Sequence, residues 1–597
     1  MLPHTPAELT PDAWRQAGRA LVAKAIAEFC YEELLQPVED RGHYRIDLPG
    51  DTFYRFDARR GAYGSWFVAP GSVQRLAGDP DSAPTAADDP LLFFADARDT
   101  LGLAGDTSGH LVRELNATLA ADARLLADAT HSASDLADLP YERLEGYQTG
   151  HPWIVLNKGR IGFSATDAQL YTPEARRPMA LPWLAVHRSL AEYRAVPGLD
   201  ANRLYRSELD GDTHAAFTAA LLRNRLDPTA YHWLPVHPWQ WDETVLPLCA
   251  GYLADRRIVP LGSAPDLYLP QQSVRTFTNT TAPARHHVKL PLSVLNTLVW
   301  RGLPTERTLA APAVTAWVQG IAQNDPYLRD ACRLVLLGEV ASVTVSHPDF
   351  DRLPGVPYQY RELLGAIWRE PIAAKLEPGE RARTLAALLH VDPAGRPFVA
   401  ELVNRSGLEP RAWLARLFAA MLPPLLHFLY VYGTVFSPHG ENAIIVYDER
   451  DVPARLAVKD FVDDVNLSAK ALPELADLPP EVAATLLREA PDHLCQFLHA
   501  GLFIGHFRYL ADLAERHLGV PGREFWRMVR AEILAYQDAS PHLAERYAVF
   551  DLLAPRIERL CLNRNRLLLD GYRDRPDRPH AAVHGTVANP LHDPDQQ

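Results

Sequence analysis

The sequence predicts an α+β fold, in which antiparallel strands and helices occupy different stretches of the chain. Residues 269–280 and 286–295 alternate as strands do, with every second side chain on one face. Residues 443–447 and 456–461 are apolar strands on either side of a charged turn, which is typical of a hairpin. From about residue 475 to 565 the pattern is that of amphipathic helices. This arrangement argues against regular βαβ units.

The first forty residues predict a helix with a well-marked start. Thr10 can cap it, Pro11 suits the first helical position, and Asp12 favours the positive helix end. Nearer the middle of the chain, residues 386–403 predict a further hairpin, turned by the sequence Asp-Pro-Ala-Gly at residues 392–395.

Length and composition limit the classes of protein to consider. A chain of 597 residues suggests three or four compact units, taking about 150 residues for each. A hydrophobic share of 47% excludes a disordered or collagen-like chain. The formal net charge is −14 and the sequence pI about 5.9, so non-specific nucleic-acid binding is not expected. An anionic ligand therefore needs a local group of basic residues.

The cysteines and the most apolar segment both indicate a soluble cytoplasmic protein. No CxxC pair is present, so the cysteines are predicted to be reduced thiols. These are Cys30, Cys249, Cys332, Cys495 and Cys561. Residues 417–436 lack formal charges and match a bilayer span in length. They include Pro423, Pro424 and His427, and nothing else resembles a second span, so a buried core helix is predicted. The N-terminus shows no signal-peptide pattern.

Basic residues stand within the two predicted strands near the middle of the chain. In the first, a period of two places Ser273, Arg275 and Asn279 on one face, where they would suit an oxyanion such as phosphate. The alternative is a solvated strand face. In the second strand, Lys289 lies opposite the apolar face, and the two strands are close enough in sequence to be neighbours.

Thr297 and Arg301 follow four residues apart, as on one side of a helical turn. Basic side chains among apolar residues are costly unless they are paired or bound to an anion. An anion pocket and an internal ion-pair network both remain open for this region.

Acidic residues gather at one end of the predicted 443–461 hairpin. The start of its first strand lies beside the end of its second, so Glu441 and Asn442 are expected near Asp460, with Asp463 or Asp464 in reach. Carboxylate and amide oxygens arranged in this way suit Mg²⁺. The alternative is a charged hairpin end without a ligand.

Two His-Pro segments complete the candidates. His151 and His237 each precede a proline and are predicted to be structural turns. Lys158 and Arg160 follow the first segment and would add positive charge to a phosphate site. The glycine-rich nucleotide loops and the HExxH and GxSxG motifs are absent from the sequence.

Taken together, these segments resemble the NRPS-independent siderophore synthetases, the aerobactin-synthetase-like ligases. In the family's order, the matching motifs are GHP…NKGRIGF (150–163), LPVHPWQ (234–240), SVRTFTN (273–279), HVKLPL…TLVWR (287–301), SPHGEN (437–442) and KDF (459–461). The resemblance runs from about residue 10 to 592 and is closest to the branch that makes alcaligin-, bisucaberin- and desferrioxamine-type hydroxamates. Glu441 departs from the pattern, because many members carry Gln there.

The resemblance implies a three-part, hand-like fold: a mainly helical thumb (1–150), β-rich fingers (151–370) and a palm with hairpins and C-terminal helices (371–597). It also implies an AMP-forming ligase that uses ATP and Mg²⁺, with ATP between fingers and palm, and a homodimer. A carboxylate is adenylated and then condensed with an amine to form an amide. In this branch both groups belong to N-hydroxy-N-succinyl-diamine units, so repeated coupling and ring closure are expected.

Carried onto this sequence, the resemblance implies three groups of site residues. The ATP ligands would be Ser273, Arg275, Thr276, Asn279, Lys289, His439 and Asn442, with Lys158 and Arg160 as helpers. The Mg²⁺ ligands would be Asp460 and Glu441, and the acyl-substrate ligands Arg301 and Thr297. Catalysis would fall to Arg301, His439 and Lys289, which stabilise charge at the α-phosphate.

Two alternatives and one chemical question stay open. A family member that activates citrate or 2-oxoglutarate is one alternative, and a non-catalytic protein that captures an anionic metabolite or siderophore is the other. The second would not need Asp460. The nucleophilic amine must also lose a proton, and Glu441, His439 and the Asp463–Asp464 pair are equal candidates to accept it.

Overall fold

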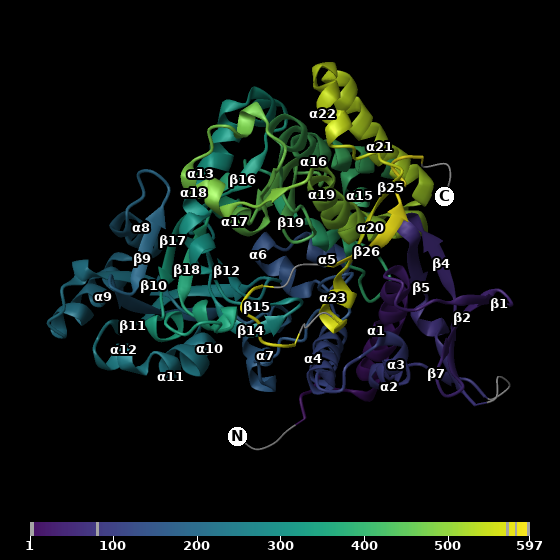
Figure 1. Cartoon of the computed structure of the whole chain (residues 1–597), viewed down its shortest axis with the longest axis horizontal. Coiled ribbons are helices and arrows are strands. Elements are labelled where there is room, and N and C mark those ends of the chain that lie inside the picture. The colour runs from purple at the N-terminus through teal and green to yellow at the C-terminus, as the bar shows by residue number, and fades with distance from the viewer. Residues whose placement is uncertain (1–4, 79–82, 569–571, 579–581, 594–597) are drawn as a thin grey trace.

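The computed structural model describes residues 5–78, 83–568, 572–578 and 582–593, and it combines helices with mainly antiparallel sheets (Figure 1). The predicted α+β class is therefore confirmed. The sequence also predicts a polar surface tail from about residue 580, and part of it lies outside the described residues, which omit 579–581 and 594–597.

The N-terminal part is built on α1 (Pro11–Tyr31), whose predicted start is confirmed. The Thr10 hydroxyl accepts a hydrogen bond from the Ala13 amide at 3.2 Å, and Pro11 is the first helical residue. The buried face of α1 packs against α2, α4 and β5, and this part of the chain also contains a five-stranded sheet. The helices are α2 (Pro90–Asp96), α3 (Arg98–Leu101), α4 (Ser108–Ala127), α5 (Ala133–Ala137), α6 (Tyr141–Leu144) and α7 (Ala165–Tyr171). The sheet contains β1 (Val38–Asp40), β2 (His43–Leu48), β3 (Thr52–Phe56), β6 (Gln74–Ala77) and β7 (Thr85–Ala86), and β4 (Ala58–Gly61) pairs with β5 (Ser65–Val68).

An eight-stranded antiparallel sheet occupies the middle of the chain. Its order is β10-β8-β11-β12-β13-β18-β17-β9. These strands are β8 (Met179–His187), β9 (Ala191–Ala195), β10 (Tyr231–Pro235), β11 (Ile258–Pro270), β12 (Thr276–Asn279), β13 (His287–Lys289), β17 (Glu339–Val345) and β18 (Gly365–Arg369). Helices of the same region are α8 (Ala201–Glu208), α9 (Gly211–Arg223), α10 (Pro238–Gln240), α11 (Leu246–Leu248), α12 (Ala250–Ala254), α13 (Thr305–Asn324) and α14 (Pro348–Asp351).

The strand predicted over 269–280 is wrong in its middle. The chain leaves β11 at Pro270 and turns before β12 begins, with the Val274 amide donating to the Gln271 carbonyl at 2.8 Å and Val274 at a φ of 69°. Ser273 and Arg275 therefore lie in this turn and do not share one strand face with Asn279. Alternation in the sequence did not reveal the turn, because its polar residues fit a period of two.

The next predicted strand is also divided. It consists of β13 and β14 (Leu292–Asn296), because Pro291 lacks the amide needed to continue the ladder. β14 pairs instead with β15 (Val299–Arg301) in a separate two-stranded sheet. The predicted neighbourhood of the two strands is confirmed, since β12 and β13 are antiparallel with Thr276 opposite Lys289.

The hairpin predicted over 386–403 is wrong. The turn exists, because the Gly395 amide donates to the Asp392 carbonyl at 2.9 Å, but a short 3₁₀ helix (Leu385–Leu389) and α15 (Phe398–Ser406) flank it. The apolar residues after the turn, which include Phe398 and Leu402, form the buried face of α15. A short apolar run does not by itself separate a buried helix from a strand.

The C-terminal part contains a four-stranded sheet and most of the remaining helices. The predicted 443–461 hairpin is confirmed, apart from its last residues, by antiparallel β21 and β22. The sheet is formed by β16 (Val335–Leu337), β22 (Pro453–Lys459), β21 (Ala443–Tyr447) and β19 (Arg381–Thr384). A smaller sheet contains β20 (Thr434–Val435), β23 (Asn466–Ser468) and β24 (Arg488–Glu489). Helices here are α16 (Pro410–Tyr432), α17 (Phe461–Asp464), α18 (Pro480–Thr485), α19 (Pro491–Gln496), α20 (Arg508–Leu518), α21 (Gly522–Ala539) and α22 (Ala544–Val549), with a π-helix over Phe497–Phe507.

Helix α16 contains the apolar segment examined for membrane insertion, and it is a core helix as predicted. Within the described chain it is the one helix with the length and composition of a membrane span, and 67% of its most apolar window is buried in the protein. Leu417, Met421 and Leu425 pack in the main hydrophobic core. The cysteines are free thiols, also as predicted.

The end of the chain returns to its beginning. Strand β25 (Arg556–Cys561) pairs with β26 (Ala582–Ala588), and α23 (Leu562–Leu568) lies near α1 (Figure 1). The buried Glu32 carboxylate at the end of α1 accepts hydrogen bonds from the Asn563 amide at 2.9 Å and the Arg564 amide at 2.7 Å. Asn563 in turn accepts from the Val155 amide at 2.8 Å.

The space around two helix glycines, Gly18 in α1 and Gly320 in α13, predicts opposite effects of Gly→Ala on the free energy of unfolding. A Cβ at Gly18 would lie 2.0 Å from the Asp88 carbonyl oxygen, whereas one at Gly320 in α13 meets no atom within 4 Å. Gly18→Ala should lower the free energy of unfolding by about 1–3 kcal/mol. Gly320→Ala should raise it by roughly 0.5–1 kcal/mol, because alanine loses less backbone entropy in a helix. Urea unfolding followed by circular dichroism measures both, and an equal effect of the two substitutions contradicts this view of the α1 packing.

Candidate functional site

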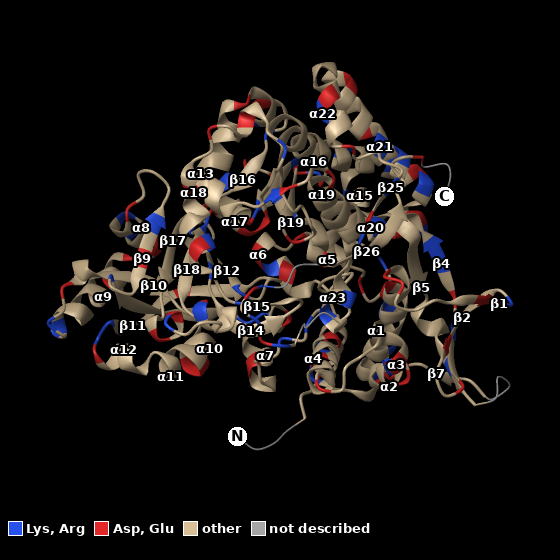
Figure 2. Cartoon of the chain, in the orientation of Figure 1, with Lys and Arg blue, Asp and Glu red and all other residues tan. Residues whose placement is uncertain are grey.

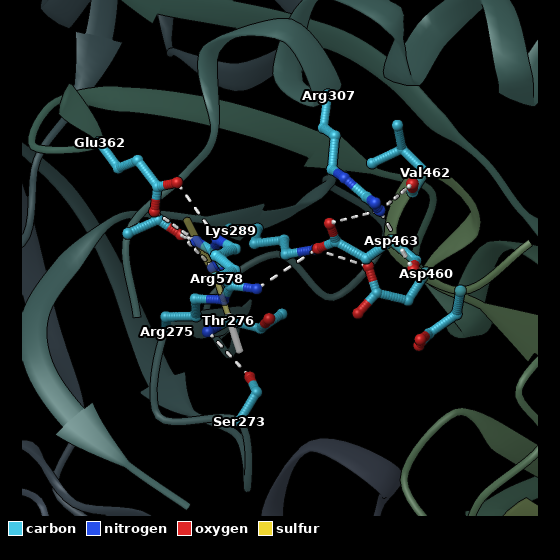
Figure 3. Close-up of polar contacts among 12 residues, drawn as sticks. Ser273, Arg275, Thr276, Lys289, Arg307, Glu362, Asp460, Val462, Asp463 and Arg578 are labelled. Carbon is cyan, nitrogen blue, oxygen red and sulfur yellow. Dashed lines mark hydrogen bonds and ion pairs between the residues drawn. The ribbon is translucent and has the colours of Figure 1, made fainter. Parts of the chain in front are cut away.

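A buried group of charges joins the eight-stranded sheet to the loop after β22 (Figure 3). The Lys289 ammonium on β13 lies 2.5 Å from Asp460 Oδ1 and 2.8 Å from Asp463 Oδ2. Its side chain is only 2% exposed. The basic residues near the middle of the chain and the acidic residues near position 460 therefore meet. We call Arg275, Lys289, Glu339, Arg369, Asp460 and Asp463 the central ion cluster.

Two members of the central ion cluster were missed by the sequence analysis. Arg369 ends β18 and lies 3.1 Å from Asp460 Oδ1 and 3.2 Å from Glu339 Oε1. Glu339 begins β17, accepts from the Val462 amide at 3.2 Å, and lies 3.7 Å from Lys289. Both are single charges within apolar strands. That pattern is the signal that could have found them, because an isolated buried charge needs a partner.

Three arginines surround the Asp463 side of the cluster. Arg275 Nη2 lies 3.4 Å from Asp463 Oδ2, and Nη1 donates to the Gly302 carbonyl. Arg307 on α13 lies 3.7 Å from Asp463 Oδ1. Arg578 donates to the same Gly302 carbonyl at 3.1 Å and pairs with Glu362 (Figure 3). Figure 2 shows acidic and basic segments near α17 in this view, in keeping with the contacts of Asp463 with Lys289 and Arg307.

The carboxyl groups of this loop differ in their proton affinity. Burial opposes ionisation of Asp460 and Asp463, but the adjacent Lys289 ammonium outweighs it and holds the pKa of both well below its usual range. Burial and the charges of Asp460 and Asp463 instead raise the pKa of Asp464 well above its usual range. One carboxyl group that favours its proton thus lies beside two that are ionised.

The start of the β21–β22 hairpin faces these carboxyl groups, as predicted. The Asn442 amide donates to Asp464 Oδ2, and His439 Nε2 lies 3.8 Å from the same oxygen. Burial lowers the pKa of His439. Glu441 lies 3.8 Å from the Lys459 ammonium. The turn out of β22 places Asp460 in the left-handed region, at a φ of 73°.

Arg301 and Thr297 are in contact, although not for the predicted reason. They belong to the β14–β15 hairpin and not to a helical turn, and Thr297 occupies the turn at a φ of 57°. Arg301 Nη2 donates to the Thr297 hydroxyl, while Arg301 Nε is buried without a partner among the described residues. Burial, followed by the charge of Arg275, lowers the pKa of Arg301 to about 10.

Several predicted site residues contact other groups. Ser273 Oγ accepts from the Thr276 amide at 3.2 Å, at the edge of the central ion cluster. Asn279 donates to Asp266 at the far end of β12. Lys158 bonds Asp122 at 2.7 Å, and Arg160 forms a buried pair with Glu174. The proposed roles of Asn279, Lys158 and Arg160 in ATP binding stay predictions.

His151 was predicted from the sequence only as a structural turn, and its ring has further interactions. Its Nδ1 accepts from the amides of Trp153 and Ile154, each at 3.1 Å, so Nε2 carries the proton of the neutral ring. Its pKa is lowered well below the usual value by burial, and then by nearby charges that include Lys24, His439 and Arg301. Arg301, a predicted acyl-substrate residue, is therefore one of the charges that act on the ring.

His237 makes the corresponding turn in the core. Its Nδ1 accepts from the Trp239 amide at 3.1 Å, and its ring packs against Tyr171 and Phe277. Burial lowers its pKa to about 3. The structural interpretation of this second His-Pro segment is therefore confirmed.

The oxygen atoms in and beside the cluster are of the kind that binds a divalent cation, but they do not form a complete coordination site. Asp460, Asp463 and Asn442 offer the carboxylate and amide oxygens that Mg²⁺ prefers. Among the described residues, no group of three or more His, Cys, Asp or Glu side chains is arranged to hold a metal by itself. The positive charge next to Asp460 and Asp463 comes from Lys289 and from the neighbouring arginines, Arg369, Arg275 and Arg307.

Comparison with known proteins assigns the chain to a class. Residues 140–390 match the profile of the IucA / IucC family, and residues 411–575 match a profile described as ferric iron reductase FhuF-like transporter. The rhizobactin siderophore biosynthesis protein RhbF of Rhizobium meliloti is 41% identical over 99% of this chain and 97% of its own length. The aerobactin synthase of Escherichia coli is 36% identical (92% and 93%), and the putrebactin synthase of a Shewanella strain 33% (95% and 89%).

Solved structures agree with this class. The aerobactin synthetase IucC of Klebsiella pneumoniae superposes with a TM-score of 0.86 at 32% identity, covering 98% of this chain and all of the other. The ATP-bound aerobactin synthetase IucA of the same organism shares the fold, with a TM-score of 0.75 at 19% identity, covering 96% of this chain and 99% of the other. The protein is thus a siderophore synthetase, a ligase that forms amide bonds. It belongs to the IucA/IucC family.

The central ion cluster predicts a large loss of stability when its cation is removed. Lys289→Met removes the ammonium group that Asp460, Asp463 and Glu339 share and leaves these carboxylates with arginine partners alone. It should lower the free energy of unfolding at pH 7 by about 3–5 kcal/mol. Because folding lowers the pKa of Asp460 and Asp463, their contribution exists above their unfolded pKa and is lost as the pH falls. The difference from the unsubstituted protein should therefore shrink below about pH 4. Urea unfolding measures it, with exposed Lys470→Met as the control. Equal stability of the two variants at pH 7 contradicts the prediction.

Proposed function

We propose that this synthetase activates a carboxylate with ATP, through an acyl-adenylate, and then condenses it with an amine. The observation that carries the proposal is the buried approach of Lys289 and Arg275 to Asp460 and Asp463. An ATP site needs cations that bind the phosphates and oxygen atoms that bind a divalent cation. Lys289 and Arg275 would meet the first need, and Asp460 and Asp463 the second. The ATP-bound relative with the same fold supports ATP as the co-substrate.

In the first half-reaction, a substrate carboxylate oxygen attacks the α-phosphate, and pyrophosphate leaves as the acyl-adenylate forms. In the second, the amine nitrogen attacks the acyl carbon, AMP leaves and the amine proton is released. Lys289, Arg275, Ser273 and Thr276 would bind the phosphates, and Arg301 with Thr297 and His151 the acyl carboxylate. Asn442 and His439 would contact the nucleotide or adenylate. Catalysis is then electrostatic and positional, without a covalent nucleophile on the protein.

The central ion cluster implies that ATP and its divalent cation bind together. Lys289 is already neutralised by Asp460 and Asp463. A phosphate gains its full attraction only when these carboxylates receive another positive charge. Mg²⁺, held by Asp460 with Glu441 or Asp463 nearby, would supply that charge and screen the phosphates.

The amine must be deprotonated before it attacks, since an alkyl ammonium with a pKa of about 10.4 is almost fully protonated at pH 7. Glu441, His439 and Asp463–Asp464 were equal candidates from sequence. We favour His439. Its pKa is lowered, so its ring is neutral and can accept a proton.

The substrate follows from the branch of the family. We propose N-hydroxy-N-succinyl-diamine units as carboxylate and amine, on the resemblance to hydroxamate synthetases and on the putrebactin relative. Citrate is the competing carboxylate, because two other relatives are named for citryl compounds: a citryl-spermidine ligase of Bacillus anthracis and an N(2)-citryl-N(6)-acetyl-N(6)-hydroxylysine synthase of Vibrio mimicus. We further propose the hand-like division at residues 150 and 370, a homodimer and a cytoplasmic location.

Product analysis tests the reaction. The protein is incubated with Mg-ATP and N-hydroxy-N-succinyl-cadaverine, or its putrescine analogue, and separately with citrate and the diamine. Pyrophosphate release and mass spectrometry should show AMP and an amide product with the succinyl substrates. Activity with citrate alone would replace the proposed substrate. Tight binding of a siderophore without pyrophosphate release would favour the non-catalytic alternative.

Substitutions separate the roles of the two sides of the site. Arg275→Ala should reduce kcat/KM for ATP by roughly 10- to 100-fold, since a charged hydrogen bond contributes about 1.5–3 kcal/mol. Asp460→Asn should abolish most Mg²⁺-dependent pyrophosphate release. Exposed Lys470→Ala is the matched control and should leave both rates unchanged. Unchanged rates in Arg275→Ala and Asp460→Asn together would refute the ATP site.

A further inference from the structure

Two lysines from different parts of the chain hold the turn that carries His151, one on each side. Lys24 on α1 donates to the His151 carbonyl at 2.6 Å. Lys158, beyond the turn, donates to the Thr149 carbonyl. The two carbonyls flank Gly150, so each side of the turn is bound by a lysine amino group. Burial, and then the charge of Lys158, lower the pKa of Lys24 to about 7.

The space around this turn requires glycine at its centre. Gly150 has a φ of +89°, and a Cβ there would lie 2.3 Å from Asn157 Oδ1 and 3.2 Å from Lys158 Nζ. Lys158 also bonds Asn157 Oδ1 at 3.1 Å and Asp122 Oδ1 on α4 at 2.7 Å. The backbone is therefore fixed by close contacts on its Lys158 side, and Lys24 fixes the other side.

The direction of the His151 ring follows from the direction of its backbone. The amides of Trp153 and Ile154 both bind Nδ1, so the Nε2–H bond can point only away from the turn. Burial, and then the charges of Lys24 and His439 among others, lower the pKa of His151, which keeps the ring neutral and Nε2 a donor. Rotation of the carbonyl that Lys24 holds would turn this donor.

We propose that Lys24 is a positioning residue of the reaction, which holds the His151 carbonyl and thereby aims the His151 Nε2–H bond at the substrate carboxylate. The proposal rests on the proposed function, in which His151 and Arg301 bind that carboxylate. It gives α1 a role in the reaction, because a residue at the start of the chain then sets the geometry of an acyl-binding donor. Lys158 supports the same turn from the opposite side.

The test compares Lys24→Met, Lys24→Arg and Arg19→Met. Arg19 lies on the same helix with an exposed side chain and serves as the matched control. Pyrophosphate release is measured with N-hydroxy-N-succinyl-cadaverine or citrate, whichever the unsubstituted enzyme uses. Lys24→Met should raise KM for the carboxylate about tenfold, the effect expected for one charged hydrogen bond. KM for ATP should stay within about twofold, because Lys289 and Arg275 are untouched.

The charged variant Lys24→Arg should restore most of the carboxylate affinity, because a guanidinium can also donate to the carbonyl. An unchanged carboxylate KM in Lys24→Met overturns the proposal, and so does a loss that Lys24→Arg does not restore. If Lys24→Met fails to fold, Asp122→Asn loosens Lys158 on the other side of the turn. Asp122→Asn should raise the carboxylate KM by about threefold, which corresponds to half the free energy of one charged hydrogen bond. An unchanged KM contradicts the proposal.

Failure of the proposed function is distinguishable from failure of this inference. An unsubstituted enzyme that releases no pyrophosphate with any carboxylate contradicts the proposed function. The position of His151 is then read from crystal structures of the unsubstituted protein and Lys24→Met. A His151 ring that keeps its orientation without the Lys24 ammonium overturns the positioning role, and a turned ring supports it.

Discussion

The site depends on one buried interaction, the contact of the Lys289 ammonium with Asp460 and Asp463. It joins β13 of the large sheet to the loop after β22, 171 positions later in the chain. Burying these charges separately would be very unfavourable, and together they remain costly unless their hydrogen bonds are satisfied. Arg369, Glu339 and the arginines around Asp463 supply those bonds. The cost is consistent with a functional role, because a hydrophobic contact would join the two sheets more cheaply.

The same interaction is compatible with the proposed binding of a polyphosphate by a protein with a net charge of −14. The cations are concentrated at one place in the fold, where the neighbouring carboxylates balance their charge. Arg301 is less well satisfied, because its Nε lacks a partner among the described residues. An unpaired polar group of this kind is expected where a substrate completes the hydrogen bonding.

The sequence predicted what depends on neighbours along the chain. The register of the β21–β22 hairpin alone brings Asn442 beside Lys459, and with it Asp460. Glu339 and Arg369 were missed because their partners come from distant strands, which no local pattern reveals. The turn before β12 and the helix α15 were mispredicted, since polar alternation and short apolar runs do not identify one structure. His151 was predicted to be a turn, which it is, but the hydrogen bond of its carbonyl with Lys24 arises only from the tertiary fold.

The contact of Glu32 with Asn563 and Arg564 has a consequence for biosynthesis. During translation the helix α1 leaves the ribosome well before residues 563 and 564, so the Glu32 carboxylate receives these two amide donors only after they have been made. Until then the segment around Val155 also lacks the Asn563 oxygen that accepts from its amide. A chain that stops before Asn563 therefore cannot complete the hydrogen bonding at the end of α1.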